Sequence, residues 1–233
     1  HLDRDLSGPK TAAGPIDGGR HPLPTREDFA ARVAQWGIQP GQLVVCYDNQ
    51  GSPYAARTWW MLRWIGHAEV RVLDGGQAAW VRAGGATATG AGPMPVATPA
   101  PYPLSGTTMP TVQASVLLGS LGAVTVLDAR AGERFRGEVE PLDTQAGHIP
   151  GASNRFFKTN LQADGCFLPA DELRTAFQAL CDSPATVVHQ CGSGVTACHN
   201  LLAMEHAGLP GSSLYPGSWS EWSADPRRPV ARG

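Results

Sequence analysis

The chain has 233 residues, of which 42% are hydrophobic and 16% charged, the composition of an ordinary globular protein. A formal net charge of −2 gives no reason to expect nucleic acid or an anionic membrane as a partner. No apolar run approaches the ~20 residues that a membrane span needs, so no membrane partner is expected.

The first third of the chain predicts alternating helices and strands. Residues 1–24 are polar and rich in turn-forming residues, and they predict loop. Thr25 followed by Asp28 resembles a capping box, and the apolar residues after it predict a helix that Gly37 stops. Further elements predicted along the chain are a strand at 43–47, a helix at 54–65, a strand at 70–73 and a short helix reaching residue 80.

A change in composition predicts a boundary between two domains. Residues 85–110 are rich in Pro, Thr and Gly and carry almost no charge, which indicates an extended linker between 1–84 and 111–233. After it, Thr111 is predicted to cap a helix, and Pro169 to occupy the first position of another. The remaining predictions are strands at 123–127 and 213–215, a turn with a short helix at 128–137, and a short helix at 217–222.

One stretch organises the second domain. Residues 187–191 read as a buried strand that ends at Cys191, and a glycine-rich turn leads into an apolar helix at 196–206. Gly192 and Gly194 allow backbone N–H groups to converge on one point, and the helix dipole adds partial positive charge there. Such a cradle stabilises a thiolate, so Cys191 is a candidate nucleophile; the alternative is a buried structural cysteine beside a turn.

The chain also contains an internal repeat. Residues 44–48 correspond to 187–191, and 74–76 correspond to 216–218, which favours two α/β units with parallel sheets and crossover helices. Asp48 stands where Cys191 stands, so the first unit carries no nucleophile of its own. The first unit begins late relative to the second, and we expect it to lack an initial strand segment.

Three segments resemble a known family. The loop at 191–196, the segment 128–137 and the Gly-His-Ile-Pro-Gly-Ala sequence at 147–152 are similar to those of rhodanese-type sulfurtransferases, and most of all to 3-mercaptopyruvate sulfurtransferases. The resemblance implies two tandem rhodanese-like domains, the first non-catalytic and the second catalytic. It implies no metal or cofactor. It also implies that Cys191 carries a persulfide, so that covalent storage of sulfur on the enzyme splits one sulfur transfer into two steps.

The resemblance also implies roles for other residues. Ser193, His21 and Asp5 match an Asp–His–Ser proton relay in which an oriented imidazole activates a hydroxyl. Arg134 matches a guanidinium that binds the substrate carboxylate, a task for which Arg is preferred to Lys. The other positions that match the substrate site are Tyr54, Gly192, Gly194, Val195 and Thr196.

The sequence departs from the family pattern at Leu142, where a second Arg is expected after Glu-Pro, and this leaves the donor open. The loop carries no charge after Cys191, which favours 3-mercaptopyruvate over the dianion thiosulfate, the alternative donor. A phosphatase is disfavoured because Ala197 stands where a phosphate-binding Arg would be, and a non-catalytic binding module is a more distant alternative.

The expected partners are small molecules and one class of protein. They are the sulfur donor and the sulfur acceptor. The acceptor is either a thiol, such as that of a thioredoxin-like protein, or cyanide. The five cysteines lack the paired spacing of zinc or redox motifs, which favours free thiols in a reducing compartment and hence a cytoplasmic protein.

Overall fold

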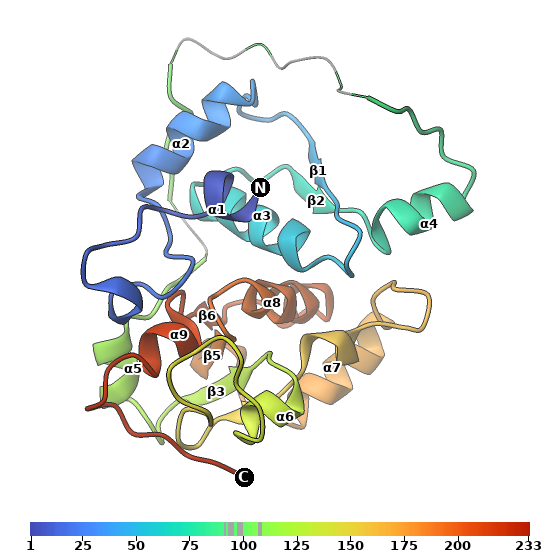
Figure 1. The fold of residues 1–233 in the computed structure, drawn as a ribbon. Helices are drawn as coiled ribbons and strands as arrows, with labels where there is room; N and C mark the ends of the chain where they lie inside the picture. Colours follow the sequence, from blue (N-terminus) through green and yellow to red (C-terminus); the bar gives the residue numbers. More distant parts are fainter. Residues whose placement is uncertain (91, 93–95, 97–99, 107–108) are drawn as a thin grey trace.

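A computed structural model describes the whole chain except residues 91, 93–95, 97–99, 107 and 108 (Figure 1). Within the described residues it contains two parallel sheets, one in each part of the chain. We call residues 1–84 the first half and residues 111–233 the second half. The predicted α/β class with parallel sheets flanked by helices is confirmed.

The first half is built on a pair of parallel strands, β1 (Val44–Cys46) and β2 (Val70–Val72), with Val44 opposite Val70. Helix α3 connects the two strands. The helices of this half are α1 (Leu2–Asp5), α2 (Arg26–Gln35), α3 (Pro53–Trp64) and α4 (Gly76–Arg82), with a 3-10 turn at Gly14–Ile16.

The second half holds a four-stranded parallel sheet in the order β4-β3-β5-β6. Its strands are β3 (Thr125–Asp128), β4 (Ser153–Asn154), β5 (Val187–Gln190) and β6 (Ser213–Leu214). Its helices are α5 (Ala114–Gly119), α6 (Gly132–Phe135), α7 (Ala170–Gln178), α8 (Thr196–His206) and α9 (Ser218–Trp222), with 3-10 turns at Phe157–Asn160 and Pro184–Thr186.

Helices cover both faces of this sheet, because successive strand residues point to opposite sides. Val126 and Val188 pack with α5 and α9 in one cluster that contains Trp219. Leu127 and Val187 pack on the other face against α7 and α8. Strand β5 lies in the interior of the sheet, so its carboxyl end opens between neighbouring strands rather than at an edge.

The two halves pack on each other through α3 and α8, which run side by side between the two sheets (Figure 1). One hydrophobic cluster contains residues of both helices, including Trp60 and Leu201. At the rim of this contact Arg63 pairs with Glu205 at 2.9 Å. The chain order β1-α3-β2-α4 in the first half repeats the order β5-α8-β6-α9 in the second, as the internal repeat predicts.

The structure confirms one local prediction about helix ends and loops and corrects three others. Thr25 caps α2 by accepting from the N–H of Asp28 at 3.0 Å, as predicted. Thr111 caps no helix, because it forms an isolated bridge with Leu214, and Gln113 stands at the N-cap of α5. Pro169 is the N-cap of α7 rather than its first helical residue. The segment 1–24, predicted as loop, contains the short helix α1.

The predicted linker 85–110 falls partly outside the described residues. Within it, Tyr102 is buried against the first half and its hydroxyl lies 2.8 Å from Nδ1 of His67. The division of the chain into 1–84, 85–110 and 111–233 stays a prediction. Among the residues that the structure describes, no helix has the length and apolar character that crossing a membrane requires.

Candidate active site

Cys191 follows the last residue of β5 and lies at the carboxyl end of the sheet, where open α/β sheets bind ligands. Helix α9 holds the cysteine backbone in place. The N–H of Cys191 donates to Oγ of Ser218 at 3.1 Å, and its carbonyl accepts from the N–H of Trp219 at 2.9 Å. Ser218 adopts a φ of +54°, an uncommon value for a residue other than glycine.

The two loop glycines have different reasons to be glycine. Gly194 adopts a φ of +77°, and a Cβ there would collide with the carbonyl oxygen of Pro216. Gly192 has no positive φ, but a Cβ there would lie 3.1 Å from Nη2 of Arg20 and 3.5 Å from Nη1 of Arg134. Gly192 therefore leaves room for two guanidinium groups, and Gly194 permits the turn.

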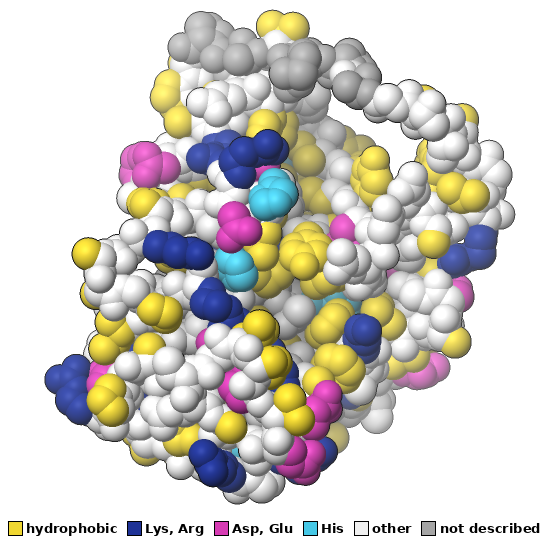
Figure 2. All heavy atoms as spheres, viewed as in Figure 1, with side chains coloured by type: hydrophobic (Ala, Val, Ile, Leu, Met, Phe, Trp, Pro, Cys, Tyr) yellow, Lys and Arg dark blue, Asp and Glu magenta, His cyan; other side chains and the backbone are white. Residues whose placement is uncertain are grey.

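A cavity of about 810 Å3 opens at Cys191 and is lined by both halves. Figure 2 shows basic, acidic and histidine side chains gathered at the middle of one face, where the two halves meet. The cavity includes eight of the ten positions that the resemblance implied. These are His21, Tyr54, Arg134, Cys191, Gly192, Ser193, Val195 and Thr196, whereas Asp5 and Gly194 do not line it.

The structure brings Ser193 and His21 together across the two halves. Oγ of Ser193 lies 2.8 Å from Nδ1 of His21, a hydrogen-bond distance. Nε2 of His21 faces Oδ1 of Asp3 at 3.4 Å. Asp5, the predicted partner, does not reach His21; it pairs with Arg4 at 2.8 Å and with Arg32 at 3.5 Å. In this structure Asp3, rather than the predicted Asp5, is therefore the carboxylate that lies next to His21.

The surroundings of His21 favour its neutral form. Burial lowers the pKa of His21, and the positive charges of Arg20, Arg57 and Lys10 act in the same direction, against Asp3. A neutral imidazole can accept a proton from the Ser193 hydroxyl.

Arg57 of α3 fixes the backbone next to Ser193 and the backbone of His21. Its guanidinium is fully buried and donates to the carbonyl of Gly194 at 2.9 Å and to those of Leu6 and His21 at 3.3 Å each. One side chain of the first half thereby holds the Cys191 loop and the His21 segment in register. Burial lowers the pKa of Arg57.

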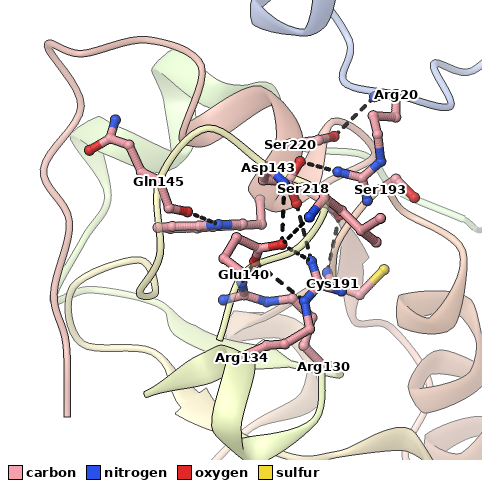
Figure 3. Close-up of polar contacts among 12 residues, drawn as sticks. Arg20, Arg130, Arg134, Glu140, Asp143, Gln145, Cys191, Ser193, Ser218 and Ser220 are labelled. Atoms are coloured by element: carbon pink, nitrogen blue, oxygen red, sulfur yellow. Dashed lines mark hydrogen bonds and ion pairs between the residues drawn. The ribbon is translucent and has the colours of Figure 1, made fainter. Parts of the chain in front are cut away.

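Arg134 lies beside the loop in a network of carboxylates (Figure 3). Its Nη2 contacts Glu140 at 2.6 Å and Asp143 at 3.2 Å. The other carboxylate oxygen of Asp143 pairs with Arg20 from the first half. Burial raises the pKa of Asp143, whereas the two arginines oppose the shift.

Arg20 is a cavity residue that sequence reasoning missed. Leu142, which replaces the expected second Arg, lines the same cavity, and Arg20 supplies a second guanidinium beside Gly192. Arg130, which also lines the cavity, is buried, pairs with Asp128 at 2.7 Å and lies over the ring of Trp219.

Comparison with known proteins places this geometry in a family. The rhodanese-like domain family matches residues 14–83 and 113–225, one segment in each half. The chain belongs to this family. It is 46% identical over 237 residues to the "Probable 3-mercaptopyruvate sulfurtransferase" of Pseudomonas aeruginosa, covering the whole of this chain and 81% of that protein. It is 36% identical to the thiosulfate sulfurtransferase of Gallus gallus, over 86% of this chain and 70% of that one.

A solved structure agrees with these matches. The 3-mercaptopyruvate sulfurtransferase from Leishmania major superposes with a TM-score of 0.80 at 29% identity, covering 98% of this chain. The chain spans 63% of the length of that protein.

The first rhodanese-like segment holds its own carboxylate where the second holds Cys191. Oδ1 of Asp48 accepts from the N–H groups of Gln50 and Ser52 at 2.8 Å each, and Oδ2 accepts from those of Tyr54 and Ala55 at 2.9 and 3.0 Å. Four amides thus converge on one anion, the arrangement that the glycine-rich loop predicted for the second half. In the first half the acceptor is the side chain of Asp48 itself.

The other cysteines of this rhodanese-like chain are poorly suited to nucleophilic attack. Burial raises the pKa of Cys46 and of Cys198 to about 12. Burial also raises the pKa of Cys166 and Cys181, which lie outside the cavity. Among the described residues, Cys191 is the one cysteine that lines the cavity.

Proposed function

We propose that this protein is a sulfurtransferase that takes sulfur from 3-mercaptopyruvate onto Cys191 and passes it to a thiol or to cyanide. The observation that carries the proposal is the Ser193–His21 contact of 2.8 Å, two residues past Cys191. A donor with a thiol proton needs such a relay, whereas thiosulfate has no proton to give up. The name of the Pseudomonas aeruginosa relative supports the same donor.

In the first step the Cys191 thiolate attacks the sulfur of 3-mercaptopyruvate. A sulfur–sulfur bond forms, the carbon–sulfur bond breaks, and its electron pair leaves on the carbon as the enolate of pyruvate. The thiol proton of the donor passes to the methylene carbon, which gives pyruvate and the Cys191 persulfide anion. Ser193 and His21 are the groups that move this proton.

In the second step the thiolate of an acceptor attacks the outer sulfur. The new sulfur–sulfur bond releases Cys191 as a thiolate, so atoms and charge balance over the cycle. The N–H groups of residues 192–194 form no hydrogen bond within the described part of the chain. They are therefore free to stabilise the sulfur anion in both steps.

The donor carboxylate fits the two arginines beside Gly192. Arg134 and Arg20 approach the loop from opposite halves and present planar guanidinium groups to the cavity. Arg20 takes the place of the second Arg that the family pattern has where Leu142 stands. Thiosulfate is the alternative donor, supported by the name of the Gallus gallus relative.

Mass spectrometry tests the persulfide directly. Wild-type protein treated with 3-mercaptopyruvate should carry one added sulfur on the peptide that contains Cys191. Cys191→Ser should carry none and lose sulfur transfer while melting like the wild type, because a hydroxyl is similar in size and a poor nucleophile at sulfur. Added sulfur on another cysteine would refute the assignment, and no added sulfur from any donor would favour a non-catalytic binding module.

Donor kinetics test the relay. Ser193→Ala should lower kcat for 3-mercaptopyruvate about a hundredfold or more, the size of a lost proton-transfer catalyst, and leave thiosulfate turnover little changed. Ser193→Thr keeps the hydroxyl and is the matched control. Equal losses on both donors would show that Ser193 only shapes the loop.

The physiological setting belongs to the same proposal. We infer a thiol acceptor such as a thioredoxin-like protein, because Cys191 lines an open cavity that a second thiol can enter. We also infer a cytoplasmic location. The five cysteines are all free in the structure, which is compatible with a reducing compartment.

A further inference from the structure

Asp143 is a buried carboxylate that bridges two arginines from opposite halves of the chain (Figure 3). One of its oxygens pairs with Arg20 and the other lies 3.2 Å from Arg134. Its side chain is 3% exposed and does not line the cavity, whereas both arginines do. Asp143 therefore acts on the cavity from behind the guanidinium groups.

The charge of the surrounding network is balanced. Glu140 also pairs with Arg134, at 2.6 Å, and with Arg130, at 3.3 Å, and Arg130 pairs with Asp128. Three guanidinium groups thus face three carboxylates. Because this network is largely buried, water screens its charges weakly, and the positive field that reaches the cavity is reduced.

The effect of this weaker field on binding depends on the charge of the donor. Repulsion from the Asp143 carboxylate acts once on a monoanion and twice on a dianion at the same place. 3-Mercaptopyruvate carries one carboxylate, whereas thiosulfate is a dianion. We propose that Asp143 is a specificity-determining residue that favours singly charged keto-acid donors over doubly charged ones, an inference that rests on the proposed sulfur transfer at Cys191.

The isosteric substitution Asp143→Asn tests this inference. It removes one negative charge and keeps an oxygen that can accept from a guanidinium. With cyanide as acceptor and ionic strength fixed, the ratio of kcat/KM for thiosulfate to that for 3-mercaptopyruvate should rise about tenfold. The change should lie mainly in KM for thiosulfate. Asp143→Glu keeps the charge and should hold the ratio near the wild-type value.

Asp225→Asn is the matched control. Asp225 is also a buried aspartate paired with two arginines, Arg227 at 2.9 Å and Arg228 at 3.7 Å, but it lies outside the cavity. Its substitution should leave the donor ratio unchanged. An unchanged ratio in Asp143→Asn, or equal losses on both donors, would overturn the inference and make Asp143 a purely structural clamp.

A measurement on the wild-type protein covers the case in which Asp143→Asn does not fold. Pyruvate, a monoanion, should inhibit sulfur transfer at lower concentration than sulfate, a dianion. Sulfate inhibition as strong as that of pyruvate would contradict the inference. Failure of the proposed function is distinguishable, because the wild-type protein would then transfer sulfur from neither donor, and the inference about Asp143 would fall with it.

Discussion

At the scale of single residues, the proposed proton relay depends on one histidine, His21, whose charge state is set by its neighbours. His21 must be neutral to accept a proton from Ser193, and burial together with Arg20, Arg57 and Lys10 lowers its pKa. Asp3 acts in the opposite direction by favouring the imidazolium form. The balance between these groups sets the lowest pH at which the relay works.

This balance predicts the pH profile of the reaction. The acid limb of kcat for 3-mercaptopyruvate should fall below pH 6.5, the ordinary pKa of histidine, because the His21 pKa is lowered. Asp3→Asn removes the one group that raises this pKa, so it should move the acid limb to still lower pH. The measurement is kcat against pH for wild type and variant.

Asp5→Asn is the control for that measurement. Asp5 pairs with Arg4 and Arg32, and the Arg4 hydrogen bond holds the pKa of Asp5 well below its usual range. Its substitution should leave the acid limb where it is. A shift of the acid limb with Asp5→Asn and none with Asp3→Asn would support the Asp5 relay that the sequence predicted.

At the scale of elements, helix α3 connects the first half to the loop that carries Cys191. Arg57 of this helix serves three carbonyl groups from three segments, at Gly194, Leu6 and His21. A strand, a glycine-rich loop and a helix can form locally in the second half, but their position against His21 is set by a side chain from another helix.

Substitution of Arg57 should therefore affect stability and catalysis together. Arg57→Ala leaves three buried carbonyl groups without a donor, so the free energy of unfolding should fall by about 3 kcal/mol or more. Among folded molecules, kcat for 3-mercaptopyruvate should fall more than kcat for thiosulfate, because the Ser193–His21 contact loosens. Denaturant melts and donor kinetics measure the two effects.

Arg63→Ala on the same helix is the comparison. Arg63 also joins the two halves, but its pair with Glu205 is partly exposed, and such pairs contribute about 1 kcal/mol or less. A variant at Arg57 that melts like the one at Arg63, with an unchanged donor preference, would show that α3 does not position the loop.

At the scale of the whole molecule, two buried histidines make stability depend on pH. Burial lowers the pKa of His189 to about 3 and that of His199 to about 4. Both are neutral in the folded state, whereas in the unfolded chain they take up protons near pH 6.5. The unfolded state binds more protons below that pH, so stability is present above pH 6.5 and is lost as the pH falls toward 4.

The expected slope can be measured. Each of the two histidines should reduce the free energy of unfolding by up to about 1.4 kcal/mol per pH unit between pH 6 and 4.5. His189→Gln should remove its share, so the variant should show a shallower slope than the wild type in urea denaturation over this range. Parallel slopes in the two proteins would mean that His189 is not buried as a neutral group.

The sequence alone predicted the fold class and the strand, turn and helix that surround Cys191. The strand before Cys191, the turn after it and the helix at 196–206 were predicted correctly, because each depends on the hydrophobic pattern and turn chemistry of adjacent residues. The repeat between the halves was also readable, since Asp48 and Cys191 occupy equivalent places after equivalent strands. Family membership followed from the same local motifs.

Only the tertiary structure decided which groups from the first half face Cys191. Asp3 and Asp5 are two residues apart and look interchangeable in a segment predicted as loop, but α1 is helical, and at about 100° per residue they point in nearly opposite directions. Arg20 and Asp143 are separated by more than a hundred residues and meet because the two halves pack through α3 and α8. Local patterns specify elements, whereas partners across a domain contact are chosen by packing, which no single segment of the sequence contains.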